Sequence, residues 1–380
     1  MAKTRPRRVA LVTSSFHPHA GGVEEHVRHV AREMSQRGVR VEVWTVDRGE
    51  GLREARVDGV RVRYLSTPLP ARDGLALMRF LGSAPAALWV WWRAFTSLRP
   101  EVLHVHCFGP NGVYALALHR LTRTPLVVTS HGETFADDHG VYDRSALLRS
   151  ALRQSIDAAV AVTGPTQFVL RDLRARFGLV DGQVVPNGVD ETAPPVESLE
   201  LPTGRPMVLA VGRLERMKGF DLLLDAAAHP ELDAVHVVIG GDGSQSSALH
   251  RRAQDTGIAD RVHFLGRVTP GQVTAAMAAA DVVVVPSRRE AFGIVALEAW
   301  RAGTPPVGTV HGGMPDFVED GVDGLLVDPA VTLDPVAAVA RVIDDVNPVE
   351  HMCRSGRDRL GDFMWSAVVD RYLSAYEDLS

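Results

Sequence analysis

Short apolar runs alternate with amphipathic stretches along almost the whole chain. Residues 9–13, 102–106 and 125–130 are continuous, largely β-branched runs of the kind that form strands buried on both faces. Between such runs lie segments such as 23–37 and 111–120, which carry apolar residues at helical spacing. Strands that alternate with helices in this way predict an α/β fold, with parallel sheets covered by helices on both faces. Ligands of such sheets bind at the carboxyl ends of the strands.

The alternation breaks once, between two halves of similar pattern. Residues 191–206 hold four prolines and no apolar period, so they predict an interdomain linker. Strand–helix alternation restarts at the next residue. We therefore predict a first domain over 1–190, a second over 207–362, and a final amphipathic helix over 363–380.

The first half contains the most apolar helix that the pattern predicts. Residues 57–65 predict one strand, and residues 75–98 predict a long helix. Its segment 81–92 holds three tryptophans and lies between Arg79 and Arg93. Such a segment is too short to span a bilayer, which takes about 20 residues. The sequence leaves two alternatives open: a helix buried in the core, or one that touches a membrane surface or an acceptor.

Composition excludes some functions and favours a compartment. The net charge of −5 argues against nucleic-acid binding. The two cysteines, Cys107 and Cys353, lie far apart and without ligand-like spacing, which indicates a reducing compartment. The basic residues near the start run directly into a strand-like segment rather than the apolar region of a signal peptide. We predict a cytoplasmic protein, with peripheral contact at the inner face of the membrane left open.

The strongest chemical pattern lies in residues 286–298, between a run of valines and a helix. Glu290 falls in the loop and Glu298 inside the helix. Ionised carboxylates only accept hydrogen bonds, so this pair suits a ligand rich in hydroxyl groups, such as a sugar or a ribose. Between them lie backbone amides at a helix N-terminus, which favour negative charge; they belong to Phe292, Gly293 and Ile294.

Other loops at strand ends add phosphate chemistry. Arg213 and Lys218 lie on a glycine-bounded loop between a strand and a helix, where two cations can clamp a diphosphate. Gly21 and Gly22 lie in another strand–loop–helix turn, an arrangement that cradles phosphate. His131 follows a strand directly and precedes a glycine, which favours a role in binding.

The histidines near the start of the chain do not have the spacing of a metal site. His17, His19, His26 and His29 lie close together in sequence, but no Cys or His-Glu-x-x-His pattern accompanies them. The chain also has no Asp-x-Asp motif, through which a metal could be held against a diphosphate. We therefore predict no metal site.

Several of these motifs together resemble a known family. Glu290-x-Phe-Gly with Glu298, the pair of Arg213 and Lys218, and His131 before a glycine are similar to the motifs of the retaining glycosyltransferases of family 4, the glycogen-synthase-like group. The resemblance covers nearly the whole chain. It implies the GT-B fold, in which two Rossmann-like domains face a cleft and the last helix crosses back onto the first domain.

The resemblance also implies roles. Arg213 and Lys218 stabilise the departing nucleoside diphosphate, Glu298 holds the ribose hydroxyls, Glu290 binds near the sugar 3-hydroxyl, and His131 contacts the transferred sugar. The implied substrate-binding positions that act largely through the backbone are Gly21, Gly22, Arg267, Val268, Phe292, Gly293 and Ile294. Residues 137–139 are candidates for the acceptor pocket.

The reaction implied is retaining, metal-independent transfer of a hexosyl group to a hydroxyl acceptor. The donor is a UDP- or GDP-linked sugar, no other cofactor is implied, and the acceptor is either a small molecule or lipid-linked. A nucleotide-sugar epimerase or a phosphorylase on the same fold is an alternative, since a fold does not fix a reaction. A catalytically silent sugar-nucleotide-binding protein is another, although it has no need for a leaving-group clamp.

Overall fold

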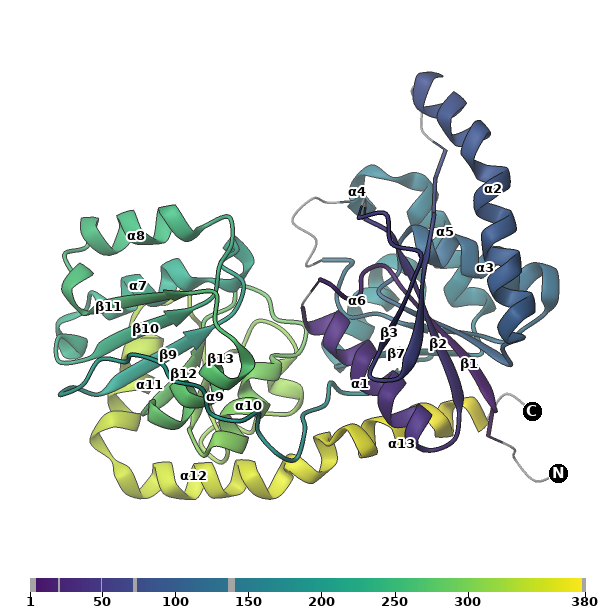
Figure 1. The fold of residues 1–380 in the computed structure, drawn as a ribbon. Helices are drawn as coiled ribbons and strands as arrows, with labels where there is room; N and C mark the ends of the chain where they lie inside the picture. The colour runs from purple at the N-terminus through teal and green to yellow at the C-terminus, as the bar shows by residue number, and fades with distance from the viewer. Residues whose placement is uncertain (1–4, 20, 49, 71–73, 136–140, 378–380) are drawn as a thin grey trace. The chain divides into compact units, whose positions relative to one another are not determined.

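The computed structural model describes residues 5–19, 21–48, 50–70, 74–135 and 141–377 (Figure 1). The chain forms two compact units, the first made of residues 1–187 and 365–380 and the second of residues 188–364. Each unit has its own sheet and its own apolar core. The prediction of two Rossmann-like α/β domains is therefore confirmed.

The first unit is built on an eight-stranded sheet in the order β3-β4-β2-β1-β5-β6-β7-β8. Neighbouring strands run parallel, except that β3 pairs antiparallel with β4 at one edge. The strand order reverses between β1 and β5, which is where ligands of such sheets bind. The strands are β1 (Arg8–Thr13), β2 (Arg40–Val46), β3 (Glu54–Val57), β4 (Val60–Leu65), β5 (Val102–His106), β6 (Leu126–Thr129), β7 (Ala161–Gly164) and β8 (Gln183–Val184).

The prediction of one strand over 57–65 is wrong. The segment contains the turn of the β3–β4 hairpin, where Asp58 and Gly59 have φ values of 49° and 80°. An Asp-Gly pair is a common hairpin turn, because both residues tolerate positive φ. The turn therefore adds an antiparallel strand to the edge of a parallel sheet.

Helices cover both faces of the first sheet. On one face α1 (Gly22–Gln36) and α13 (Trp365–Glu377) pack against Val9 and Leu11 of β1. On the other face Ala10 and Val12 meet helices that include α2. This alternation explains the continuous apolar runs in the sequence. The remaining helices of this unit are α2 (Gly74–Leu98), α3 (Pro110–Thr122), α4 (Val141–Arg144), α5 (Ala146–Ala158) and α6 (Gln167–Phe177).

The final helix belongs to the first unit, although it follows the second in sequence. On α13, Val368, Tyr372 and Tyr376 are buried in the same cluster as Val27 and Val30 of α1. The last helix thus returns to the first unit, as the resemblance implied. Within the part of the chain that is described, no helix combines the length and apolarity needed to cross a membrane.

The second unit has a six-stranded, all-parallel sheet in the order β11-β10-β9-β12-β13-β14. Counted along the chain, this is the order of the Rossmann fold, and it reverses between β9 and β12. Ligands are expected outside the carboxyl ends of those two strands. The strands are β9 (Met207–Val211), β10 (His236–Gly240), β11 (Val262–Gly266), β12 (Val282–Val285), β13 (Pro306–Thr309) and β14 (Leu325–Val327).

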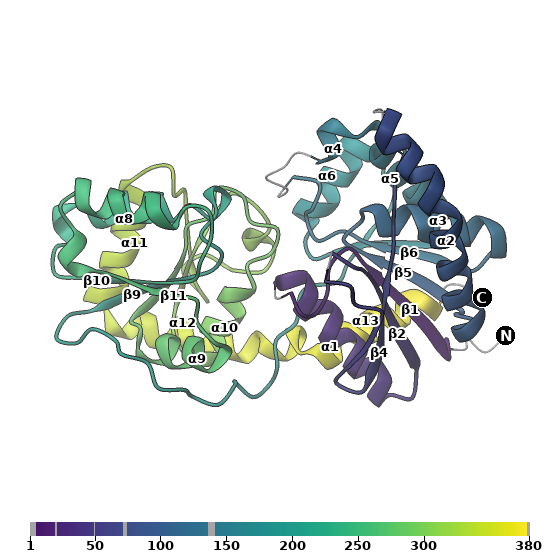
Figure 2. The same ribbon diagram turned by 45° about the horizontal axis from the view of Figure 1, so that its top comes forward.

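Two layers of helices cover this sheet as well. Helices α8 and α11 lie on one side of the strands, and α9 and α10 on the other (Figure 2). The α-helices are α7 (Phe220–Ala227), α8 (Ser246–Asp255), α9 (Pro270–Ala279), α10 (Ile294–Ala302), α11 (Leu333–Asp344) and α12 (Val346–Arg359). Short 3₁₀ helices are η1 (Arg216–Lys218), η2 (Pro230–Leu232), η3 (Ala259–Arg261), η4 (Met314–Asp316) and η5 (Leu360–Phe363).

Residues 191–206, predicted as a linker, contain no helix or strand and lie against the second unit. Leu199 and Leu201 pack on its core. The Thr269 hydroxyl donates to the Glu197 carboxylate at 2.6 Å. The middle of the segment, residues 197–201, is therefore anchored to the second unit.

Candidate functional site

Two loops at the carboxyl ends of β9 and β12 bring opposite charges together. Residues 212–219 follow β9, and residues 286–293 follow β12. The Lys218 ammonium donates to Oε2 of Glu290 at 2.8 Å, across 72 positions of sequence. Two residues that the sequence predicted to be catalytic thus form an ion pair where the order of the strands reverses.

Glu290 is held by a hydroxyl group as well as by the lysine. Its side chain is only 9% exposed, and the Ser287 hydroxyl donates to the same Oε2 at 2.7 Å. Burial acts to raise the pKa of Glu290, but the Lys218 charge and these hydrogen bonds outweigh it and hold the pKa below its ordinary value. Glu290 is therefore ionised at neutral pH and can only accept hydrogen bonds from a ligand.

Glycines allow the loops of this site to touch backbone to backbone. At Gly219 φ is 68°, and a Cβ there would lie 2.0 Å from the carbonyl oxygen of Pro286. A Cβ on Gly312 would likewise lie 2.0 Å from the carbonyl oxygen of Glu290. The Glu290 amide donates to the carbonyl of His311 at 3.0 Å. The position of Glu290 thus depends on glycines in two neighbouring loops.

An arginine ties the β9 and β12 loops together from the side. The Arg288 guanidinium donates to both carboxylate oxygens of Asp221 at 2.7 Å, and its backbone amide donates to the carbonyl of Met217 at 2.8 Å. Sequence reasoning missed this contact, because no motif links the two residues. Arg213, on the same β9 loop, is exposed. The loop therefore presents one fixed cation, Lys218, and two exposed cations, Arg213 and Arg216.

The predicted amides lie at the start of α10. Gly293 has φ 95° and immediately precedes Ile294, the first residue of the helix. Phe292 is 2% exposed and stacks on Phe317, with ring centroids 4.4 Å apart. Glu298 is half-buried within the same helix. The first amides of a helix have no partner inside it, so this end can receive negative charge.

Arg267 and Val268 lie on the opposite side of the β9 loop from Glu290. They follow β11, where Arg267 is exposed and Val268 lies against Gly240 at the end of β10. The Leu214 amide donates to the carbonyl of Asp242 at 3.0 Å, which ties the β9 loop to the β10 loop. The structure therefore brings all the predicted residues of the second unit to the same end of its sheet.

The first unit gathers histidines at the carboxyl ends of β5 and β6. Nε2 of His131 lies 3.2 Å from Nδ1 of His106, and the rings of His26 and His131 have centroids 4.7 Å apart. Burial lowers the pKa of His131 to about 4 and pushes the pKa values of His26 and His106 well below the ordinary range. All three imidazoles are therefore neutral at pH 7.

Two tyrosines of α13 reach into this histidine cluster. The Tyr372 hydroxyl lies 2.9 Å from Nε2 of His26, and the Tyr376 hydroxyl lies 2.5 Å from Nδ1 of His104. Sequence reasoning missed both. Their spacing of four residues on an amphipathic helix was the available sign that they share a face.

Glu133 fixes the backbone beside His131 and was also missed. One carboxylate oxygen accepts from the Phe108 amide at 3.0 Å, and the other accepts from the His131 amide at 2.7 Å and the Ser130 hydroxyl at 3.0 Å. Burial raises the pKa of Glu133, while these donors act to lower it. The carboxylate joins the loops after β5 and β6 and holds His131 in place.

The glycine pair lies at the start of α1. Gly22 is the first residue of the helix, and Gly21 precedes it in extended conformation. Apart from its chain neighbours and the backbone of its own helix, no described residue has an atom within 4 Å of the position that a Cβ on Gly22 would take, so the backbone is open there. His26 follows on the same helix, so this turn and His131 share one end of the first sheet. The acceptor candidates at 137–139 lie outside the described residues.

One histidine group among the described residues has the chemistry of a metal site. The ligand atoms of His26, His106 and His131 lie within 4.8 Å of one another. Zinc at about 2.0–2.1 Å from each nitrogen needs nitrogens about 3.4 Å apart, so this set would have to close further to bind it. The absence of a metal from the reaction stays a prediction.

Because the buried histidines are neutral, the stability of the first unit depends on pH. Unfolding exposes them to water, where their pKa is near 6.5, whereas folded His131 titrates near 4. The unfolded state binds more protons between these values, so stability is full above pH 6.5 and falls as the pH drops toward 4, by up to about 1.4 kcal/mol per pH unit per histidine. Amide hydrogen exchange of β5 and β6 at several pH values measures this.

The variant His104→Gln tests this pH dependence, because it removes one of the buried histidines. Burial lowers the pKa of His104 to about 3. The variant should reduce the pH dependence by about one proton. His351→Gln, at an exposed position of the second unit, should leave the dependence of the first unit unchanged. Protection that stays constant from pH 7 to pH 5 contradicts the prediction.

Comparisons with known proteins match both halves of the chain. A family model described as Glycosyltransferase Family 4 matches residues 20–193, and one described as Glycosyl transferases group 1 matches residues 195–359. D-inositol 3-phosphate glycosyltransferase from Mycolicibacterium smegmatis is 32% identical, over 98% of this chain and 91% of that protein. 2-Deoxystreptamine N-acetyl-D-glucosaminyltransferase from Streptomyces fradiae is 33% identical, over 86% of this chain and 82% of that protein.

Solved structures share the fold. Sucrose-phosphate synthase from Thermosynechococcus elongatus superposes with a TM-score of 0.82 at 21% identity, covering 98% of this chain and 99% of that one. Anabaena HepE in complex with UDP-glucose superposes with a TM-score of 0.72 at 20% identity, covering 97% and 99%.

The two Rossmann-like units and these matches define the class of protein, an enzyme of the GT-B fold that transfers glycosyl groups. The chain belongs to glycosyltransferase family 4.

Proposed function

We propose that this enzyme transfers a hexosyl group from a UDP- or GDP-linked sugar to a hydroxyl acceptor, with retention of anomeric configuration and without a metal ion. The observation that carries the proposal is the ion pair of Lys218 and the buried, ionised Glu290 at the point where the second sheet reverses its strand order. This point of a parallel sheet is where ligands bind, so the position of the ion pair favours a role in ligand binding over a purely structural one.

In this proposal the second unit binds the donor. Departure of the nucleoside diphosphate develops negative charge, which Lys218, the exposed Arg213 and the first amides of α10 stabilise. Glu298 accepts hydrogen bonds from the ribose hydroxyls, and Glu290 accepts from the hydroxyls of the sugar. The backbone at Arg267 and Val268 contacts the base. That HepE has been solved with UDP-glucose supports a UDP-linked donor.

The first unit contributes contacts to the transferred sugar and the acceptor. His131 is neutral at pH 7, so it offers one donor and one acceptor to hydroxyl groups. The open backbone at Gly22 admits close approach of a polar ligand, and a Cβ on the neighbouring Gly21 would lie 2.6 Å from Oε2 of Glu24, so this turn has no room for side chains. We propose no protein nucleophile.

The acceptor has two candidates. The names of the two relatives, which act on an inositol phosphate and an aminocyclitol, support a small cyclitol-like molecule. The exposed apolar side chains of α2 favour a lipid-linked acceptor instead, reached by a cytoplasmic enzyme in peripheral contact with the membrane.

Calorimetric titration tests the donor assignment. With a chelator present, one nucleoside diphosphate among UDP, GDP and ADP should bind tightly and NAD should not. Glu298→Ala should weaken that binding by about 1–3 kcal/mol, as expected for a lost hydrogen bond to a charged group. Glu231→Ala, a control on η2, should change nothing. Binding of NAD instead, or no effect of Glu298→Ala, would overturn the proposal.

Product analysis separates the alternatives. Transfer in the presence of chelator, with the anomeric configuration of the product assigned by NMR, tests metal independence and retention together. An epimerase would isomerise the donor with no acceptor present. A silent binding protein would form no product with any acceptor.

A further inference from the structure

We propose that the outer face of α2 docks the first unit onto the surface of an anionic phospholipid bilayer. Five large apolar side chains on this helix face solvent, and we name them the outer stripe. They are Met78 (70% exposed), Leu81 (62%), Leu88 (52%), Trp89 (59%) and Trp92 (47%). Single exposed apolar residues are normal on a soluble protein, but a contiguous set on one element marks an interaction surface.

The outer stripe follows the period of the helix. At about 100° per residue, its five members fall within an arc of about 100° on one side of the helix. The opposite side holds the packed face, where four side chains are at most 2% exposed, namely Ala87, Trp91, Ala94 and Leu98. A surface helix normally carries one apolar face and one polar face. Helix α2 carries two apolar faces, and only one of them has a partner in the core.

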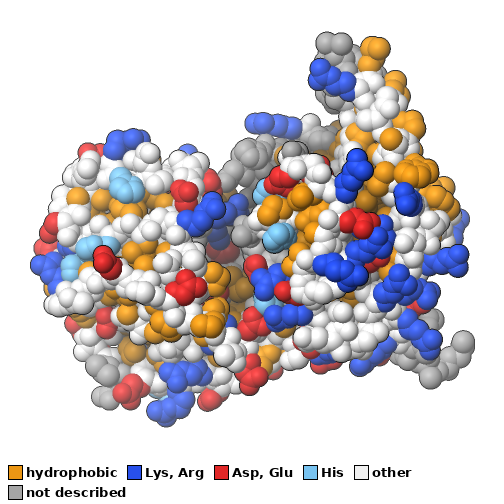
Figure 3. All heavy atoms as spheres, in the orientation of Figure 1, with side chains coloured by type: hydrophobic (Ala, Val, Ile, Leu, Met, Phe, Trp, Pro, Cys, Tyr) orange, Lys and Arg blue, Asp and Glu red, His pale blue; other side chains and the backbone are white. Residues whose placement is uncertain are grey.

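The figures agree with this division. The N-terminal part of α2 projects beyond the neighbouring helices of the first unit (Figure 1). Hydrophobic side chains gather along that helix on the face shown in Figure 3. Its apolar surface is therefore open to a broad, flat partner rather than enclosed in a groove.

The charges on α2 select the sign of the partner. The helix contains Arg79 and Arg93 and no acidic residue. The Arg93 guanidinium lies over the Trp89 ring, 5.4 Å from its centroid. Among the described residues, neither arginine lies within ion-pair distance of a carboxylate. An arginine over an exposed tryptophan, with a second arginine on the same helix, matches the interfacial region of a membrane, where anionic headgroups meet the acyl chains.

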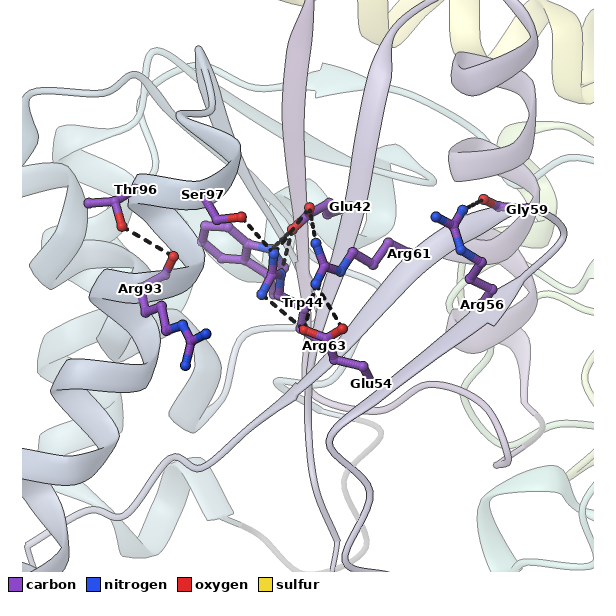
Figure 4. A network of polar contacts seen from close by, with 10 residues as sticks. All are labelled: Glu42, Trp44, Glu54, Arg56, Gly59, Arg61, Arg63, Arg93, Thr96 and Ser97. Carbon is purple, nitrogen blue, oxygen red and sulfur yellow. Dashed lines mark hydrogen bonds and ion pairs between the residues drawn. The ribbon is translucent and has the colours of Figure 1, made fainter.

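A pocket beside the outer stripe extends this surface. It is lined by Trp89 and Arg93 of α2, by Arg53, and by residues of β3 and β4 and of the segments beside them; two of the lining residues are acidic, Asp47 and Glu54. Arg61 and Arg63, which also line it, are engaged by acidic side chains, as Figure 4 shows for Glu42 and Glu54. Among the described residues that line the pocket, Arg53 and Arg93 form no hydrogen bond or ion pair with a carboxylate, and the Arg93 charge acts on Glu54 only from a distance. They are the cations that can receive a headgroup phosphate.

A second copy of the chain fits the outer stripe less well. Self-association through this face would bring Arg79 and Arg93 of two copies together without a carboxylate from α2 to compensate. An anionic bilayer supplies that compensating charge over its whole surface. The docking surface does not depend on the proposed reaction, so the two can fail separately.

Co-sedimentation of the full chain with lipid vesicles tests the proposal. Vesicles of phosphatidylcholine with about one-third phosphatidylglycerol should bind the protein. Vesicles of phosphatidylcholine alone should bind it about 25-fold more weakly, since two arginines near an anionic surface each add about fivefold. High salt should reduce binding to the anionic vesicles. Tryptophan fluorescence should shift to the blue on binding. No sedimentation, or equal binding to both vesicles, overturns the proposal.

Variants separate the apolar and the basic parts of the surface. One double variant replaces the tryptophans, Trp89→Ser with Trp92→Ser, and a second replaces the arginines, Arg79→Glu with Arg93→Glu. Each double variant should weaken vesicle binding by about tenfold or more. The controls are Leu121→Ser and Val180→Ser, which remove side chains of the first unit that are 74% and 92% exposed but lie outside α2. They should bind as the unchanged protein does.

Further measurements keep these results interpretable. An unchanged far-ultraviolet circular dichroism spectrum and an unchanged midpoint of thermal unfolding establish that each variant is folded. Sedimentation velocity tests whether a second copy of the chain occupies the outer stripe instead. A dimer that dissociates in the Trp89→Ser variant would overturn docking on a bilayer. Full vesicle binding by the variants of the outer stripe would also overturn docking on a bilayer.

Discussion

Replacing Lys218 by alanine should lower kcat/KM by about 10²–10³-fold, because it removes a fixed cation from the leaving-group side of the donor. The Lys218 ammonium donates to Oε2 of Glu290 at 2.8 Å, and this ion pair fixes its position on the loop. Among the described residues, the change also leaves the buried Glu290 carboxylate with only the Ser287 hydroxyl as a side-chain donor. Steady-state kinetics with the donor identified by titration measures the loss.

The control for Lys218→Ala is Arg216→Ala, two residues earlier on η1. The Arg216 side chain is exposed, and its backbone carbonyl, which the variant retains, accepts a hydrogen bond from Arg288. This variant should keep kcat/KM within about twofold, as expected for a surface change. Thermal unfolding of both variants separates lost chemistry from lost structure. A Lys218→Ala enzyme that keeps a third of its activity would show that the lysine is structural.

Replacing Gly219 by alanine should destabilise the second unit by about 3–5 kcal/mol and weaken nucleotide binding more than tenfold. Part of the cost is the positive φ of 68°, which an alanine adopts at about 1–2 kcal/mol. The rest arises because the new Cβ would lie 2.0 Å from the Pro286 carbonyl oxygen, so the β9 and β12 loops must move apart. Urea unfolding and calorimetric titration measure the two effects.

Gly257→Ala is the matched control for this backbone contact. Gly257 lies in the same unit with a similar φ of 74°, but nothing lies within 4 Å of the position of its added Cβ. It should cost only about 1–2 kcal/mol and leave nucleotide binding unchanged. Equal costs for the two variants would mean that the close approach to Pro286 does not hold the loops.

The sequence predicted the parts of the site that lie within single loops. Glu290, Lys218 and the start of α10 belong to local patterns of spacing, and strand–helix alternation places those loops at one edge of a sheet. Their contact with one another follows from the strand order, in which β9 and β12 are neighbours although two strands separate them in sequence.

The residues that support the site could not be predicted in the same way. Arg288 meets Asp221 across 67 positions, and Tyr372 meets His26 across 346. Neither pair has a local pattern, because each depends on how distant elements pack. The β3–β4 hairpin was mispredicted for a different reason. Its Asp-Gly turn is visible in the sequence, but the prediction placed it inside a single strand over 57–65.

The first unit is discontinuous in sequence, and this has a consequence for biosynthesis. Its sheet and most of its helices lie before residue 188, but α13 is made only after the whole second unit. Until then the apolar face of β1 that α13 shares with α1 is only partly covered, and His26 and His104 lack their tyrosine partners. On the ribosome the second unit can therefore complete its core before the first, reversing the usual amino-terminal-first order of domain folding.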